Sequence, residues 1–141
     1  MVDLGSTFSV PRQPVPHYRF SRIYWEATRA RKLLVQYCVA TGKYQFYPRP
    51  VSIYNGSTNL EWREVSGEGT VFTYTVAQRP PDLFKGHEPY GIVNVTLDVG
   101  VNVIGIIVNC SRERLQIGLR VKPYWHPLPD GTHLLMFQPQ E

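Results

Sequence analysis

Cysteine and long apolar runs are both scarce in this sequence. Only two of its 141 residues are cysteines, Cys38 and Cys110, which is too few for a disulfide framework. The best apolar stretch, Val101–Val108, is interrupted by Asn102 and Gly105 and falls far short of the roughly 20 residues that cross a bilayer. The first residues show neither the basic nor the apolar part of a secretion signal. We therefore expect a cytoplasmic protein with two reduced thiols and no membrane contact.

Net charge is absent from most of the chain. The formal charge of +4 arises from residues 1–32, which hold six basic residues against two acidic ones, whereas residues 33–141 hold nine of each. A groove that binds nucleic acid needs an excess of basic residues near its aromatic side chains. The balance over residues 33–141 therefore argues against a nucleic-acid partner.

Helix-forming residues such as Ala, Leu, Lys and Glu are scarce, while nine Tyr, six Phe and many Val residues favour strands. One helix is predicted, with Ser21 as its N-cap. Its apolar face falls at helical spacing on Phe20, Ile23, Tyr24, Ala27 and Arg31. Before the helix, the prolines at positions 11, 14 and 16 favour an extended arm that either wanders or lies on a partner.

After residue 32 the apolar pattern alternates, which predicts a mainly β chain. Strands are expected at residues 33–38, 43–47, 60–65, 70–76, 92–97, 101–108, 119–124 and 133–137. Gly105 inside one of them suggests a β-bulge or a sharply coiled strand. The last five strands fit a small closed barrel of the OB type. The predicted organisation is an N-terminal arm and helix over 1–34, a pair of hairpins over 35–64 and a five-stranded OB-fold barrel over 65–141.

The hairpin region contains two turns with the spacing of zinc-ribbon knuckles. A zinc knuckle has the form C-x-x-C-G, which directs two thiolates at one tetrahedral ion. The two corresponding turns are Cys38–Gly42 and Ser52–Gly56. Their spacing and their glycines are present, but three of the four thiols are not, so the hairpins form a degenerate ribbon.

The order of several short motifs carries a specific resemblance. The segments FSRIYWEATRARKLLVQYC, YPRPV, GSTNLEW and GEGTVFTYTV follow one another along the chain. This order resembles the acyl-CoA-associated OB-fold family with a rubredoxin-like zinc ribbon, catalogued as domain of unknown function thirty-five, over about residues 20–137. The matching residues are Tyr24-Trp25-Glu26, Pro48-Arg49-Pro50 and Gly67-Glu68-Gly69-Thr70-Val71. The resemblance implies a helical arm, then a ribbon, then a barrel.

The family's zinc ligands map onto Cys38, Thr41, Ser52 and Asn55 of this sequence. Two hydroxyls and a neutral amide do not replace three thiolates on zinc, so we expect no structural zinc and no other cofactor. Side-chain packing and hydrogen bonds would then hold the ribbon. The expected apolar filling is Tyr44, Phe46, Tyr54 and Trp62.

The resemblance also implies a function. Members of the family usually work as small subunits of thiolase-like enzymes, which make or break a carbon–carbon bond beside an acyl-CoA thioester. Cys110 has no nucleophile elbow and the four histidines have no metal-ligand spacing, so we predict no catalytic residue and no metal ligand. The expected protein is a non-catalytic subunit of a larger thiolase, acyltransferase or retro-aldolase. In that complex Arg29 and Arg31 would attract the phosphates of the acyl-CoA.

Two alternatives remain open from the sequence. The first is a single-stranded nucleic-acid-binding OB-fold protein, in which Phe72 and Tyr74 stack on bases. The second is a free acyl-CoA-binding module or stand-alone enzyme, in which Arg49, His87 and Tyr90 line a pocket on the barrel. Binding of oligonucleotides would support the first, and acyl-CoA binding without a partner chain would support the second.

Overall fold

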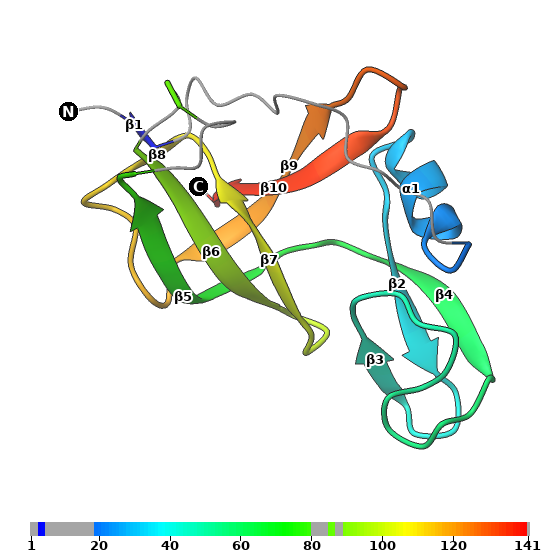
Figure 1. Ribbon diagram of the computed structural model, residues 1–141. Helices are drawn as coiled ribbons and strands as arrows, with labels where there is room; N and C mark the ends of the chain where they lie inside the picture. Colours follow the sequence, from blue (N-terminus) through cyan, green and yellow to red (C-terminus); the bar gives the residue numbers. More distant parts are fainter. Residues whose placement is uncertain (1–2, 5–18, 80–84, 87–88, 141) are drawn as a thin grey trace.

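A computed structural model describes residues 3–4, 19–79, 85–86 and 89–140 (Figure 1). The predicted proline arm, His17 and His87 lie outside these residues. The described chain forms a short helix, a three-stranded sheet and a closed barrel, with the sheet and the barrel as two separate lobes in Figure 1. Within this part of the chain, no helix has the length and hydropathy needed to cross a membrane.

The barrel consists of the five predicted strands at the C-terminal end of the chain. They are β5 (Gly69–Ala77), β6 (Tyr90–Leu97), β7 (Asn102–Ile107), β9 (Arg120–Pro127) and β10 (His133–Pro139). Neighbouring strands pair antiparallel, except that β10 pairs with β7 in parallel where Phe137 lies beside Ile107. The order β10-β7-β6-β5-β9 closes on itself because β9 also pairs with β10. This confirms the predicted OB-fold barrel.

The barrel core forms around Phe137, whose ring is fully buried. A β-carbon on Gly105 would lie 3.1 Å from two carbons of that ring, so the glycine leaves room for it. The predicted bulge at Gly105 is wrong, because β6 and β7 pair without a register shift there. The irregularity lies instead in β5, between Val71 and Thr73, where Phe72 has no partner in the register.

The three-stranded sheet is the predicted ribbon. Its strands β2 (Leu33–Cys38), β3 (Lys43–Gln45) and β4 (Leu60–Val65) pair antiparallel in the order β3-β2-β4. Strand β3 ends at Gln45, earlier than predicted, because the chain then turns toward the barrel. There the Tyr47 hydroxyl accepts a hydrogen bond from the backbone N–H of Ile104 in β7 at 3.2 Å.

The beginning of the chain is anchored on the barrel lobe. Strand β1 (Asp3–Leu4) pairs antiparallel with β8 (Cys110–Ser111), and Leu4 is completely buried in the core. The prediction of an arm that is either unattached or bound to a partner is therefore wrong for these two residues. A two-residue strand has no periodicity, so the sequence carries no signal for it.

Helix α1 (Arg22–Thr28) is shorter than predicted, and its buried side only partly matches the predicted apolar face. Tyr24 of that face is buried, together with Thr28, whereas Phe20 and Ile23 are 40% and 49% exposed. Ser21 occupies the N-cap position but makes no capping hydrogen bond with its side chain. The helix lies against β2 and the beginning of β10 (Figure 1).

Hydrogen bonds attach the end of α1 to the β9–β10 hairpin. The Thr28 hydroxyl accepts from the backbone N–H of His133 at 3.1 Å, and the Thr28 carbonyl lies 2.8 Å from Nδ1 of His133. A carbonyl oxygen only accepts, so this contact requires the proton on Nδ1. Arg29 donates to the backbone carbonyl of Asp130 at 2.6 Å. These contacts fix the helix against the barrel.

Candidate functional site

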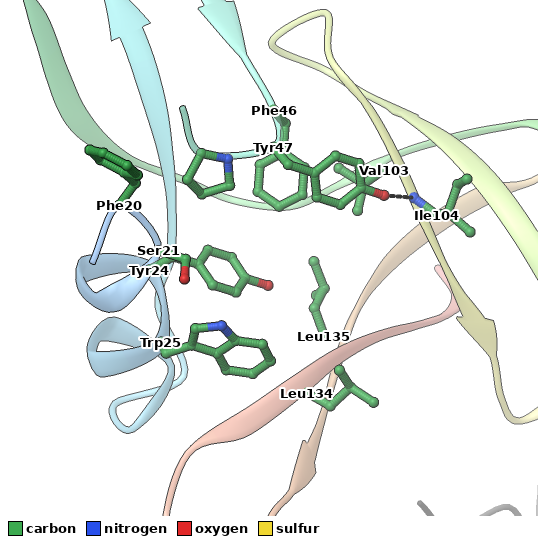
Figure 2. A pocket seen from close by; sticks show the side chains of 11 residues that line it. Phe20, Ser21, Tyr24, Trp25, Phe46, Tyr47, Val103, Ile104, Leu134 and Leu135 are labelled. Atoms are coloured by element: carbon green, nitrogen blue, oxygen red, sulfur yellow. Dashed lines mark hydrogen bonds between the residues drawn. The ribbon is translucent and has the colours of Figure 1, made fainter. Parts of the chain in front are cut away.

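An apolar pocket of about 380 Å³ lies where the helix, the ribbon and the barrel meet. Its walls come from four segments of the chain, as Figure 2 shows. The lining residues are Phe20, Ser21, Tyr24 and Trp25 from the helix region, Phe46, Tyr47 and Pro48 after β3, Val103 and Ile104 from β7, and Leu134 and Leu135 from β10. A concave, mostly apolar surface of this volume is typical of small-molecule sites.

Aromatic rings build the helix and ribbon side of the pocket. Tyr24 meets Trp25 and Phe46 edge to face, with ring centroids 5.3 and 5.6 Å apart. In Figure 2 the rings of Tyr24 and Trp25 lie across the pocket from Leu135 and Leu134. Such edge-to-face contacts favour a fixed arrangement of rings. The pocket wall is therefore held by its own packing.

No charged side chain is among the lining residues of the pocket. Burial raises the pKa of the Tyr24 hydroxyl, so this group stays uncharged at neutral pH. Tyr47 accepts its hydrogen bond from the Ile104 N–H, shown as the dashed line in Figure 2. A site with apolar walls and uncharged hydroxyls suits an apolar ligand or the uncharged part of a larger one.

Large apolar side chains remain exposed where the pocket opens. Phe20, Tyr47 and Ile104 line the pocket and are 40%, 47% and 59% exposed. Exposed apolar side chains that gather around a cavity are characteristic of ligand or protein contact sites.

Of the residues predicted to bind acyl-CoA, the four that the structure describes are not among those lining this pocket. Tyr90 is buried at the beginning of β6, and Arg49 lies in the ribbon loop that follows Pro48. Arg29 is exposed and forms an ion pair with Glu26 at 3.2 Å besides its contact with Asp130. Arg31 is exposed just after the helix. Their predicted role in binding stays a prediction, as does that of His87, which the structure does not describe.

The sequence motifs nonetheless include part of the pocket. Tyr24, Trp25 and Pro48 belong to the quoted motifs and line its walls. The barrel residues Val103 and Leu135 were missed, because in the sequence they read as ordinary alternating core positions. Only the placement of the helix against β10 turns them toward a cavity.

The apolar filling of the ribbon is partly as predicted. Tyr44, Phe46 and Trp62 are partly buried against the core. Tyr54 is 42% exposed, so its prediction as filling is wrong. The Lys43 ammonium instead lies over the Tyr54 ring, 5.2 Å from its centroid, and this cation–π contact favours a surface position.

The matched zinc positions do not fit zinc. The Cys38 thiol is buried and donates to the Asn55 side-chain oxygen at 3.9 Å, while the other two positions offer the hydroxyls of Thr41 and Ser52. One thiol, two hydroxyls and an amide are not a donor set for this ion. In the part of the chain that the structure describes, no three His, Cys, Asp or Glu side chains gather as metal ligands would.

Comparisons with known proteins agree with this architecture. The family model described as the rubredoxin-like zinc ribbon domain of ChsH2 matches residues 25–51, and the model of the ChsH2 C-terminal OB-fold domain matches residues 62–126. A DUF35 domain-containing scaffold protein of Pyrococcus furiosus is 30% identical over 99 residues, which are 70% of this chain and 73% of that protein. The chain belongs to the DUF35 family.

Other relatives of this DUF35 chain are larger or part of complexes. A probable enoyl-CoA hydratase alpha subunit of Thermomonospora curvata is 29% identical over 129 residues, which are 90% of this chain but 40% of that protein. A chain in the structure named Ltp2-ChsH2(DUF35) aldolase superimposes with a TM-score of 0.78 at 28% identity. That match covers 90% of this chain and 98% of the other.

Proposed function

We propose that this DUF35 chain is a non-catalytic accessory subunit, which binds a larger thiolase-like enzyme acting on acyl-CoA substrates. The observation that carries the proposal is the match to nearly all of one chain of the Ltp2-ChsH2(DUF35) aldolase. The relative from Pyrococcus furiosus is named a scaffold protein, which supports the same role. The complex would be a hetero-oligomer in which the partner supplies the reactive groups.

The described residues offer no reactive thiol of their own. Cys38 and Cys110 are 0% and 1% exposed, so a substrate does not reach either sulfur. Cys110 belongs to the core cluster, as predicted for a small buried apolar side chain. A nucleophilic cysteine needs access and an activating neighbour, and these thiols lack the first.

The helix and the ribbon offer an apolar surface for the partner. Phe20 in the turn before α1 and Ile23 in the helix are exposed, as are Tyr47, Val51 and Ile53 on the ribbon loops. Aromatic side chains are enriched in the core of protein interfaces, and the aliphatic side chains beside them add apolar area that a partner would bury. We propose this surface as the contact with the larger enzyme.

The pocket and the basic end of the helix fit the two halves of an acyl-CoA. Ser21 lines the apolar pocket at one end of α1, whereas Arg29 and Arg31 follow the other end. The seven helical residues between them give the helix a length of about 10 Å. An elongated ligand with an uncharged thioester arm and distant phosphates suits that separation.

The partner is tested by recovering the tagged full chain from its native source and identifying bound chains by mass spectrometry. The proposal expects a thiolase-like enzyme in fixed stoichiometry. Its binding should be lost in Ile23→Glu and kept in Ile117→Glu, since Ile117 is 68% exposed but lies in the segment between β8 and β9. A chain that stays monomeric, or that turns over acyl-CoA alone, would contradict it.

The substrate role is tested by calorimetry on the assembled complex. Ile104→Trp should narrow the pocket opening and weaken acyl-CoA binding, with Ile117→Trp as the matched control. Arg31→Glu should weaken binding and reduce its salt dependence, because it removes one phosphate contact. Unchanged affinity and salt dependence in Arg31→Glu would refute the proposed contact between Arg31 and the acyl-CoA phosphates. It would not affect the proposal that the chain binds a partner enzyme.

A further inference from the structure

Both degenerate knuckles keep the backbone turn of a zinc knuckle. In the first, the Gly42 N–H donates to the Cys38 carbonyl at 2.8 Å, and in the second the Gly56 N–H donates to the Ser52 carbonyl at 2.9 Å. The two glycines have φ values of 69° and 73°, which favour glycine over other residues. The turns are thus equivalent in hydrogen bonding and in backbone conformation, although three thiols are absent.

The side chains at the four positions that match the family's zinc ligands form hydrogen bonds with one another. The Cys38 thiol donates to Asn55, and hydrogen bonds from the Ser52 and Thr41 side chains lower the pKa of that thiol. Asn55 in turn accepts from the Ser57 N–H at 2.9 Å. Ser52 is only 2% exposed. The buried Cys38 thiol thus finds hydrogen-bond partners on both turns, of which Thr41 and Asn55 are exposed.

Two buried glutamines hold the loop that carries the second knuckle. Gln36 and Gln45 are directly opposite each other on β2 and β3, and both are buried. The Gln45 amide N–H donates to the Gln36 oxygen at 2.8 Å, so the two side chains form one unit. Gln36 lies within the segment FSRIYWEATRARKLLVQYC, but neither glutamine is among the matching residues named for the family resemblance.

The glutamine pair reaches the loop on both sides of Ser52. Gln36 donates to the Arg49 carbonyl and accepts from the Arg49 N–H, each at 2.8 Å. Gln45 donates to the Val51 carbonyl at 3.2 Å and accepts from the Ile53 N–H at 2.9 Å. Backbone groups of three loop residues are thus paired with side chains that are themselves buried and satisfied.

We infer that the ribbon of this chain folds without zinc, with the Gln36–Gln45 pair and the hydrogen-bonded knuckle residues holding the loop that metal holds in a zinc ribbon. A zinc site fixes both knuckles through four bonds to one ion. Here the same loop is fixed by a complete amide network, and removing one member leaves partly buried backbone groups without their partners.

The first test is metal dependence of the purified full chain. Elemental analysis should find zinc far below one per chain, and a strong chelator should leave the thermal midpoint and the ribbon's near-ultraviolet signal unchanged. One tightly held zinc per chain, or unfolding on chelation, would overturn the inference.

The second test removes the amide while keeping its volume. In Gln45→Leu, the backbone amide of Ile53 loses its acceptor and should exchange hydrogen about tenfold faster or more, whereas barrel amides such as that of Val93 keep their protection. Gln116→Ala is the control, since Gln116 is exposed. Equal protection at Ile53 in both variants would show that the glutamine pair does not hold the loop.

The third test restores the missing thiols. The variant with Thr41→Cys, Ser52→Cys and Asn55→Cys should take up one Co²⁺ per chain with the visible absorption of a tetrahedral thiolate site, and the unaltered chain should take up none. Tetrahedral binding in the variant supports knuckles that kept their geometry. A folded variant without that absorption would contradict it.

Discussion

The two glycines of the Gly67-Glu68-Gly69 motif lie at the junction of the ribbon and the barrel, where a side chain would not fit. A β-carbon on Gly69 would lie 2.4 Å from the backbone oxygen of Thr96 and 2.8 Å from a methyl carbon of Val95. The φ of Gly69 is not left-handed, so a glycine is needed at this position only because there is no room for a side chain. Gly69→Ala should therefore destabilise the protein by forcing β5 away from β6.

The magnitude follows from which atom must move. Inserting a carbon into a packed site costs about 1–3 kcal/mol, and Gly69→Ala should fall at the upper end because a strand backbone cannot rotate aside. Gly100 supplies the contrast, since its φ is 97° and no atom lies within 4 Å of an added β-carbon. Gly100→Ala should cost only the backbone strain, about 1–2 kcal/mol.

A third variant combines both effects. Gly67 has a φ of 78°, and its added β-carbon would lie 2.4 Å from a ring carbon of Pro123 in β9. Gly67→Ala should therefore destabilise at least as much as Gly69→Ala. The expected order of destabilisation is Gly67, then Gly69, then Gly100.

Thermal unfolding of the three variants, followed by circular dichroism, measures this order. For a chain of this size about 1 kcal/mol corresponds to about 3–5 °C in the midpoint, so Gly69→Ala should lower it by about 10 °C and Gly100→Ala by about 5 °C. Urea unfolding gives a second estimate from the same proteins. If Gly100→Ala lowers the midpoint as much as Gly69→Ala, the argument from close backbone approach is refuted.

Three further predictions concern the helix contact, pH and nucleic acid. Thr28→Val should destabilise by about 1–3 kcal/mol in urea unfolding, because it leaves the backbone N–H of His133 unpaired, and an unchanged midpoint would contradict this. The hydrogen bond from Arg120 lowers the pKa of Asp98 below 3.8, so its stabilisation is present at neutral pH and is lost as the pH falls through that lowered pKa. Asp98→Asn should thus lower the thermal midpoint slightly at pH 7, with the difference from the unaltered chain closing below pH 3.8; a constant difference would contradict it. Filter binding at low salt should detect no retention of single-stranded oligonucleotides, and tight retention would favour the nucleic-acid alternative.

The barrel was predictable because its strands are rich in apolar and β-branched residues, and because their order limits the topology. Strand β6 alternates clearly, whereas β10 contains the continuous apolar run Leu134–Phe137. The helix was located, but its buried side was predicted only in part. Periodicity identifies an apolar face, yet Phe20 and Ile23 on that face remain exposed because the helix contacts β2 and β10 with Tyr24 and Thr28. Which side is covered depends on tertiary placement.

The ribbon shows a different limit of sequence reasoning. The sequence shows that three of the four thiols are absent and that other interactions must hold the ribbon together. Side-chain packing and hydrogen bonds were the expected replacement, but the sequence did not identify the buried pair Gln36 and Gln45, which makes the hydrogen bonds to the loop. Glutamine is usually exposed, so its type alone gives no sign of such a role. Only the cross-strand register places the two amides together.

The pocket has no counterpart in any single stretch of sequence, because each wall depends on a different attachment. Thr28 and Arg29 attach the helix to the β9–β10 hairpin, and Tyr47 attaches the ribbon loop to β7. A partner that binds over Ile23 would press on the same helix whose Tyr24 lines the cavity. Under the proposed accessory role, partner binding and the shape of the pocket are then coupled through the position of α1. The chain would assist the larger enzyme by how it holds these walls, since its own buried thiols take no part.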